Sequence, residues 1–219
     1  MVSFGLVSEG PSDQIVIENI LFGLFKNPDL AINRLQPKPR EAGNWVKVLD
    51  YCSSSEFKSA LTFNDYLIVQ IDTDVLISEQ LPPQYKIDLP TDLTVAEIVE
   101  RVSQKLIGLI DDANGFWQNH GEKIIFAISV HAIECWLLPV YYRSQIQTAS
   151  KTTGCLKALN KVLNTQEGFT IDAKEERYYT KPSKKLRKEI HHIYTFNPSL
   201  NIFVENIQAK NIVIEDNEV

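Results

Sequence analysis

Gly5-Leu6-Val7-Ser8-Glu9-Gly10-Pro11-Ser12-Asp13 is an apolar, strand-like run that ends in carboxylates. A second run, Tyr66-Leu67-Ile68-Val69-Gln70-Ile71-Asp72-Thr73-Asp74, ends in two more. Both runs are rich in β-prone residues, so we expect buried strands. Side chains at the carboxyl ends of parallel strands converge on one crevice. The two segments therefore predict that Glu9, Asp72 and Asp74 meet at one edge of a sheet.

Carboxylates gathered in one crevice repel one another unless a cation lies among them. Asp13 adds a fourth, inside the helix expected after Glu9, and Glu134 a fifth, near the start of a helix after a third strand. Mg²⁺, with Mn²⁺ as an alternative, prefers such oxygen ligands, whereas zinc is disfavoured because the cluster brings no Cys. We expect one or two ions that stabilise charge on a phosphoryl group. The candidate metal ligands are Glu9, Asp72, Asp74, Glu134 and Asp13.

Each acid also has a purely structural interpretation. Asp-x-Asp is common in turns, where Asp caps the following segment. Asp13 and Glu134 could each complement the positive end of a helix, and His131 could be a cap rather than a base. Glu9 and the aspartate pair both follow buried strands, and this shared placement favours the metal site.

Strands alternate with helices through residue 140, which predicts an α/β fold with a mostly parallel, Rossmann-like sheet and helices on both faces. The expected strands cover residues 2–8, 31–36, 65–71 and 123–130. The expected helices cover about 11–25, 45–51, 53–61, 94–117, 131–138, 156–163, 184–194 and 199–207. We expect a core at 1–140 and a helical C-terminal extension at 141–219, packed on that core.

Capping boxes and loops set the boundaries of these elements. Ser53 with Glu56, and Thr94 with Glu97, have the spacing of capping boxes at helix starts. Proline-rich segments at 36–43 and 77–92 are expected to be loops. The last ten residues are expected to form either a strand or a tail.

Composition limits the functional classes. The chain has 219 residues, of which 44% are apolar and 23% charged, as in ordinary globular proteins. No run approaches the roughly 18 apolar residues of a membrane span, and we expect no membrane association and no signal peptide. Three cysteines without ligand-like spacing favour a reducing, cytoplasmic setting without structural zinc. The sequence contains no Gly-x-Gly-x-x-Gly, no P-loop and no Gly-x-Ser-x-Gly.

Positive charge is concentrated near the C-terminus. Residues 151–192 carry ten Lys and Arg against five Asp and Glu, although the net charge is -6. Such a basic segment could bind a nucleic acid backbone, and a solvated helix face is the equal alternative. The candidate nucleic-acid-binding residues are Lys181, Lys184, Lys185, Arg187 and Lys188.

The chain resembles the Toprim family, the metal-binding domain of topoisomerases, primases and OLD-type nucleases. The family's Glu-Gly motif is matched by Ser8-Glu9-Gly10-Pro11-Ser12-Asp13, and its Asp-x-Asp motif by Ile71-Asp72-Thr73-Asp74. A Gly often follows the second Asp in the family, whereas this chain has Val75.

A closer resemblance is to small stand-alone Toprim-like proteins encoded beside ATPases in bacterial anti-phage loci. It rests on His131-Ala132-Ile133-Glu134-Cys135-Trp136-Leu137-Leu138, on Tyr179-Thr180-Lys181, and on Asn197-Pro198-Ser199-Leu200 with Phe203. Altogether the resemblance covers roughly residues 2–207.

The resemblance implies a Rossmann-like fold and a Mg²⁺-dependent site that uses Glu9, Asp72 and Asp74. By analogy with OLD-type nucleases, Glu134 would be an extra ligand and Lys181 would stabilise the transition state. The catalytic candidates are thus Glu9, Asp72, Asp74 and Lys181.

We therefore expect a metal-dependent nuclease that hydrolyses phosphodiesters of DNA or RNA, tRNA included. It would be the effector of an anti-phage system whose partner ATPase acts as sensor and gate. One alternative is a non-catalytic subunit that binds and regulates that ATPase, which the acidic body of the chain motivates. Another is primase-like transfer to a nucleotide. The oligomeric state stays open, with a homo-oligomer as one option.

Overall fold

A four-stranded, all-parallel sheet forms the centre of the computed structural model, which describes residues 2–74 and 82–214. The sheet order is β2-β1-β3-β4. All four expected strands are present, so the mixed α/β class with a parallel sheet is confirmed. The strands are β1 (Ser3–Val7), β2 (Ala31–Gln36), β3 (Tyr66–Asp72) and β4 (Ile124–Ser129).

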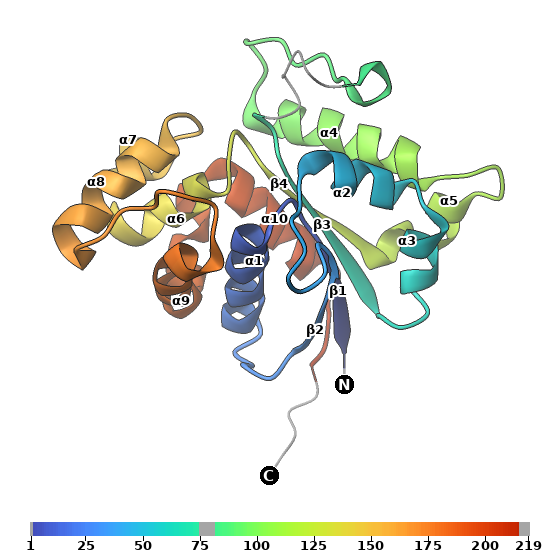
Figure 1. Cartoon of the computed structure of the whole chain (residues 1–219), viewed down its shortest axis with the longest axis horizontal. Coiled ribbons are helices and arrows are strands. Elements are labelled where there is room, and N and C mark those ends of the chain that lie inside the picture. The colour runs from blue at the N-terminus through green and yellow to red at the C-terminus, as the bar shows by residue number, and fades with distance from the viewer. Residues whose placement is uncertain (1, 75–81, 215–219) are drawn as a thin grey trace.

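Helices cover both faces of this sheet (Figure 1). One face packs against α1 (Pro11–Leu24), α6 (Glu134–Tyr141), α8 (Cys155–Glu167), α9 (Glu176–Ile193) and α10 (Pro198–Ala209). The opposite face packs against α2 (Trp45–Cys52), α3 (Ser55–Ala60) and α4 (Val95–Ile110). The remaining short helices are α5 (Phe116–His120), α7 (Ile146–Ala149) and the 3₁₀ turns η1 (Pro83–Tyr85), η2 (Gly121–Lys123) and η3 (Tyr194–Phe196).

The two cores explain why strands β1, β3 and β4 are mostly apolar. In β3, Ile68 packs in the first core, whereas Leu67 and Val69 pack in the second. Because successive strand side chains point to opposite faces, a strand covered on both faces has no position for an exposed side chain. The continuous apolar runs in the sequence follow from this arrangement.

The C-terminal helices share the first core with the N-terminal part of the chain. Helix α9 lies along α1, and the two approach closely at Gly23. A Cβ at Gly23 would lie 2.4 Å from the backbone oxygen of Arg187, so this contact excludes any side chain. Arg34 also joins the two regions, because its guanidinium contacts both Glu18 and Glu176.

Two boundary predictions were wrong at the start of helices. The cap of α3 is Ser54 rather than Ser53, since the Ser54 hydroxyl accepts the Phe57 N–H at 3.2 Å. Helix α6 begins at Glu134 rather than 131, because His131 has a φ of 72°, which is incompatible with a right-handed helix.

Two helix lengths also differ from the prediction. Helix α4, capped by Thr94 and Glu97 as expected, ends at Ile110 rather than near 117. The chain turns at Gly115, whose φ is 68°, before α5 begins. Helix α9 begins at Glu176, eight residues before the expected start, because buried residues such as Tyr179 extend its apolar stripe toward the N-terminus.

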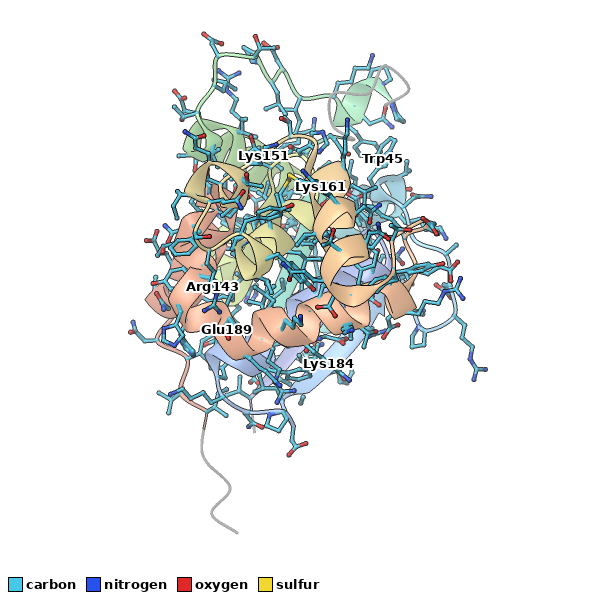
Figure 2. The ribbon with its side chains drawn as sticks, turned by 90° about the vertical axis from the view of Figure 1, so that its left-hand side faces the viewer. Trp45, Arg143, Lys151, Lys161, Lys184 and Glu189 are labelled. Atoms are coloured by element: carbon cyan, nitrogen blue, oxygen red, sulfur yellow. A yellow bond between two sulfur atoms is a disulfide. The ribbon has the colours of Figure 1, made fainter. Side chains whose placement is uncertain are left out.

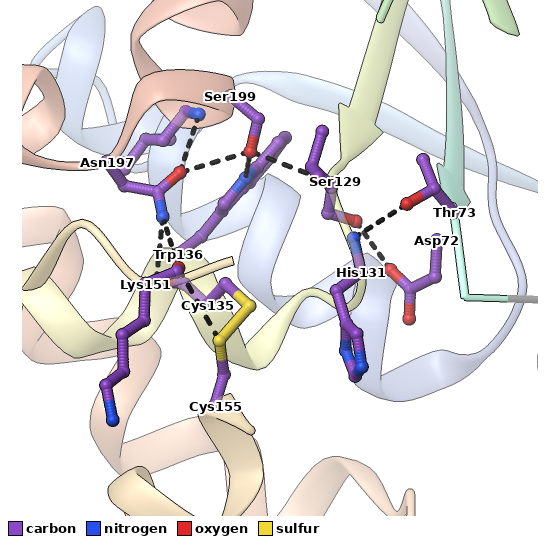
Figure 3. The surroundings of a disulfide bond; sticks show 12 residues. Asp72, Thr73, Ser129, His131, Cys135, Trp136, Lys151, Cys155, Asn197 and Ser199 are labelled. Carbon is purple, nitrogen blue, oxygen red and sulfur yellow. Dashed lines mark hydrogen bonds between the residues drawn. A yellow bond between two sulfur atoms is a disulfide. The ribbon is translucent and has the colours of Figure 1, made fainter. Parts of the chain in front are cut away.

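A disulfide joins Cys135 in α6 to Cys155 at the start of α8 (Figure 3). The third cysteine, Cys52, is free and buried. The sequence offered no local signal for this pairing, because the partners are 20 residues apart and meet through packing of the two helices. From the sequence we expected a reducing setting and assigned no disulfide, so this bond was not predicted. The cytoplasmic location stays a prediction.

Some expectations lie outside the described residues. Val75 and the part of the expected loop 77–92 up to residue 81 are among them, as is the end of the C-terminal strand or tail, 215–219. Within the part of the chain that the structure describes, no helix combines the length and apolar character needed to cross a bilayer.

Candidate functional site

Glu9 and Asp72 lie next to each other at the carboxyl edge of the sheet. Strands β1 and β3 are parallel neighbours in which Val7 pairs with Val69. In this register Glu9, two residues beyond the end of β1, lies level with the end of β3. The Glu9 Oε1 accepts the backbone N–H of Asp72 at 2.6 Å. The two acids therefore meet as the sequence predicted.

Asp72 is fully buried and has partners on both of its oxygens. Its Oδ1 accepts hydrogen bonds from Ser129 Oγ at 2.5 Å and from Gln70 Nε2 at 2.9 Å. Ser129 is available because it pairs with Asp72 across β3 and β4, as Figure 3 shows. The Oδ2 of Asp72 lies 2.8 Å from the ammonium of Lys174. Asp72 is thus held in place by the Lys174 ammonium and by two polar neighbours.

Asp13 contrasts with Asp72, because it is buried without a hydrogen-bond partner in another described residue. It lies in the first turn of α1 with no exposed surface. Neither carboxylate oxygen has a hydrogen-bond partner in another described residue. Desolvation, followed by the charges of Asp72 and Glu134, raises the pKa of Asp13 to about 8. A buried carboxylate of this kind is costly unless a proton or a cation compensates it.

Glu134 is the first residue of α6 and belongs to the same cluster. It is 2% exposed and accepts a hydrogen bond from the hydroxyl of Tyr179 in α9. Burial and the nearby Glu134 raise the pKa of Tyr179 above its ordinary value. The charge of Glu134 also contributes to the raised pKa of Asp72 and of Asp13.

The acidic cluster contains more carboxyl groups than positively charged groups, and this shifts the pKa values of its members. Burial, then Asp72 and Asp13, raise the pKa of Glu9. Burial also raises the pKa of Asp72, although Lys174 opposes that shift. For Lys174, desolvation is outweighed by the three acids Asp72, Asp13 and Glu134, and its pKa is raised. One ammonium therefore faces four carboxyl groups, and a further cation or protons would stabilise the cluster.

Asp74 follows Asp72 by two residues and is the last described residue before position 75. Its backbone N–H donates to the carbonyl oxygen of His131 at 3.1 Å. His131 in turn donates its backbone N–H to Thr73 Oγ1 at 2.7 Å, which Figure 3 shows. These bonds join the turn after β3 to the turn after β4, and they explain how His131 is held in its left-handed conformation.

The basic candidates lie on α9, and three of them contact groups outside the acidic cluster. Lys181 and Lys185 both pair with Glu167 at the end of α8. Arg187 lies over the ring of Phe22 in α1. Lys174, rather than Lys181, is the lysine that contacts Asp72. The residues Lys181, Lys184, Lys185 and Lys188 border one shallow cavity of about 330 Å³ on the outer side of α9.

A cavity of about 380 Å³ opens onto the acidic cluster. Its wall includes Glu9, Asp13 and Lys174, together with Trp45 at the first position of α2. The other lining residues belong to the α1 start and to the loop before α2: Gly10, Pro11, Glu41, Ala42, Gly43 and Asn44. Two of the predicted acids therefore border this cavity, Glu9 with a small exposed surface and Asp13 with none.

Sequence reasoning missed several members of the site. Gln70 gave a signal, because it is a polar residue inside an otherwise apolar strand. Ser129 gave a similar but weaker one at the end of β4. Lys174 and Trp45 gave none, since each lies near a loop with no pattern that points to the acids.

The donor chemistry of the cluster fits a hard divalent cation such as Mg²⁺. Neither oxygen of Asp13 has a hydrogen-bond partner in another described residue, and the charges of Glu9 and Asp72 act on it or on its neighbours in the cluster. The coordination sphere is not assembled, however. Within residues 2–74 and 82–214, no three His, Cys, Asp or Glu side chains are arranged so that they could hold a metal ion. A cation would have to compete with the Lys174 ammonium for Asp72.

No family model, no curated protein and no solved structure matches this chain. What the structure defines is a class, namely an α/β protein with a parallel sheet and an acidic cluster at its carboxyl edge.

Proposed function

We propose that this chain is a metal-dependent nuclease with the Toprim-like site that the motifs suggest. The observation that supports it most is the position of Asp13, fully buried without a hydrogen-bond partner in another residue, among Glu9, Asp72 and Glu134. A buried carboxylate without such a partner is destabilising, and strongly perturbed buried acids cluster at functional sites. A divalent cation is the ligand that would both neutralise the cluster and bring a phosphate to it.

The residues have separate roles in this proposal. Glu9, Asp13 and Asp72 would hold Mg²⁺ or Mn²⁺, with Glu134 and Asp74 as further candidates. When bound, such an ion would supply charge stabilisation for in-line attack on a phosphodiester. Gln70 and Ser129 orient Asp72 through its Oδ1. Lys174, released from Asp72, would leave its ammonium at the cavity wall to bind the phosphate.

The proposed substrate is DNA or RNA, with tRNA as one example. The exposed lysines of α9, with Lys181 and Lys185 partly neutralised by Glu167, would bind the backbone at a distance from the acids. The proposed biological setting is an anti-phage system in the cytoplasm with an ATPase partner from the same locus. This setting rests on the resemblance alone.

A second candidate is a non-catalytic Toprim-like subunit that regulates the partner ATPase. The salt bridge between Lys174 and Asp72 favours it, because the chain itself supplies a cation where a catalytic ion would bind. In this case the cluster would be a structural remnant and the chain would act through binding.

Cleavage and binding assays separate the two candidates. Plasmid, single-stranded DNA and tRNA are incubated with the purified chain and Mg²⁺ or Mn²⁺, with and without the ATPase. A nuclease loses cleavage in Asp72→Asn and Glu9→Gln and keeps it in the control Glu205→Gln, an exposed acid of α10. Cleavage that survives Asp72→Asn contradicts the proposal. Binding to the ATPase without cleavage of any substrate supports the regulatory subunit.

A further inference from the structure

The cavity beside the acidic cluster has an aromatic wall. Trp45 is partly buried, packs against the second core and borders the same cavity as Glu9, Asp13 and Lys174. The cavity therefore combines an aromatic surface, carboxylates and an ammonium within about 380 Å³. This volume is in the range of pockets that bind one small ligand.

The loop before α2 is held firmly against the acids, which fixes the position of Trp45. A Cβ at Gly43 would lie 2.0 Å from the carbonyl oxygen of Glu9, so the two backbones are in direct contact. Gln14 of α1 donates to the carbonyl of Pro37 at 2.9 Å. Asn44 caps α2 by accepting the Lys47 N–H. Trp45 is thus part of a rigid wall of the site.

The residues of this loop and of the first turn of α2 carry an excess of positive charge, which suits a phosphate backbone. Lys38, Arg40 and Lys47 lie in or beside the loop, against the single acid Glu41. Figure 2 looks onto the side formed by α8 and α9 and labels Trp45, three lysines and the ion pair of Arg143 with Glu189. The labelled lysines are Lys151, Lys161 and Lys184, all of which are exposed.

We propose that Trp45 is the stacking platform for one unpaired nucleobase, so that the site takes single-stranded nucleic acid with the adjoining phosphate at the acidic cluster. This inference rests on the proposed function for its choice of nucleic acid as ligand. A base inside a duplex is stacked between its neighbours and cannot lie on a side chain without leaving the helix. An aromatic side chain stacks any base, because every base has a π-face. The site therefore selects for strandedness rather than for sequence.

Binding measurements with defined oligonucleotides test this inference without any cleavage. The probes are fluorescein-labelled dA₁₂ and rA₁₂, a duplex of equal length, and a 12-mer of abasic sites, all with Ca²⁺ in place of Mg²⁺ so that a hard cation can occupy the acidic cluster. Trp45→Ala should weaken binding of the two single strands about tenfold, as expected for loss of one stacked base. It should leave the duplex and the abasic strand unchanged. Trp45→Phe keeps an aromatic ring, so its affinity for the single strands should fall less than that of Trp45→Ala.

The matched control is Trp117→Ala. Trp117 is also partly buried, but it belongs to α5 and stacks on Phe126 of β4. Trp117→Ala should not change the affinity of any probe.

A second measurement, tryptophan fluorescence, does not depend on the stability of the Trp45→Ala variant. In a Trp117→Phe background the remaining tryptophans are Trp45 and the fully buried Trp136. Single strands should then quench tryptophan fluorescence, and the abasic strand should not.

The inference is overturned if Trp45→Ala binds single strands as tightly as the wild type, if it weakens the abasic strand equally, or if no probe binds. Its failure differs from failure of the proposed function. Cleavage that needs Asp72 but not Trp45 would overturn the inference and leave the nuclease standing. Binding that needs Trp45, without cleavage of any substrate, would support the inference and overturn the nuclease.

Discussion

The ammonium of Lys174 lies 2.8 Å from Oδ2 of Asp72, although 102 residues separate them in the sequence. Asp72 has no exposed surface, whereas the Lys174 side chain is 49% exposed. The lysine therefore reaches in from the surface, from the segment just before α9, and contributes positive charge at the centre of an acidic cluster. This ion pair links the C-terminal helices to the strand that carries the Asp-x-Asp motif.

Replacing Lys174 by alanine should lower stability and strengthen the response to divalent cations. Asp72 would keep its burial but lose its cation. Because Lys174 is half-exposed and screened by solvent, we expect a loss of about 1 kcal/mol in the free energy of unfolding. Mg²⁺ should then raise the melting temperature more than in the wild type, since no ammonium competes for Asp72.

Urea denaturation and calorimetric melting with and without Mg²⁺ check this expectation. Lys184→Ala, on the exposed side of α9, is the control and should change neither quantity. An unchanged Mg²⁺ response in Lys174→Ala would contradict the idea that lysine and metal share one position.

Asp13→Asn should stabilise the metal-free chain at pH 8 and not at pH 4. The folded-state pKa of Asp13 is raised to about 8, whereas an unfolded Asp has a pKa near 3.9. Between these values the folded state binds the proton more tightly, so stability falls as the pH rises through this window. The neutral amide removes that loss, and we expect a gain of a few kcal/mol at pH 8.

Urea titrations in EDTA at the two pH values measure this difference. Asp65 provides a control of opposite sign, because hydrogen bonds from the Ser3 backbone and hydroxyl lower its pKa. Asp65→Asn should therefore lose stability at pH 8. Equal stability of Asp13→Asn and the wild type at pH 8 would show that Asp13 is already compensated.

Gly43→Ala should destabilise the loop beside the acids. The added Cβ would lie 2.0 Å from the carbonyl oxygen of Glu9, a backbone atom that cannot move without displacing the site. We expect a loss of about 1–3 kcal/mol. Gly108→Ala in α4 is the matched control, because nothing lies within 4 Å of its added Cβ. It should stabilise the chain by about 0.5–1 kcal/mol. Thermal melting of both variants measures the two changes in stability. A change of the same sign in both variants would contradict the prediction.

Reduction of the disulfide between Cys135 and Cys155 should lower stability by roughly 3 kcal/mol, as expected for a loop of this length. Denaturation curves with and without a phosphine reductant measure the effect. Cys155→Ser should show the lower stability in both conditions, because it has no bond to lose. A wild-type curve that the reductant leaves unchanged would mean that the cysteines are not paired in solution.

The sheet and the meeting of Glu9 with Asp72 could be predicted because they depend on local patterns. A strand covered on both faces reads as an apolar run, and parallel neighbours place their carboxyl ends together. The ends of helices were harder, because they depend on single residues. His131 delays α6 through its backbone conformation, and Gly115 separates α5 from α4.

The Lys174 contact, the disulfide and the aromatic wall at Trp45 could not be predicted. Each joins segments that are distant in the sequence, and none has a periodicity or spacing of its own. Lys181 was expected at the site from its motif, yet its contact is with Glu167, because helix α9 directs that side chain toward α8.

The sequence by itself determined the α/β class, the four parallel strands and the carboxylates that close two of them, because hydrophobic burial and strand geometry act over a few residues. The tertiary structure alone decided which charges compensate these acids. Packing of α9 on α1 brings Lys174 to Asp72 and leaves Asp13 buried without a hydrogen-bond partner in another residue. Electrostatic compensation depends on distance in space, and the sequence does not contain that distance.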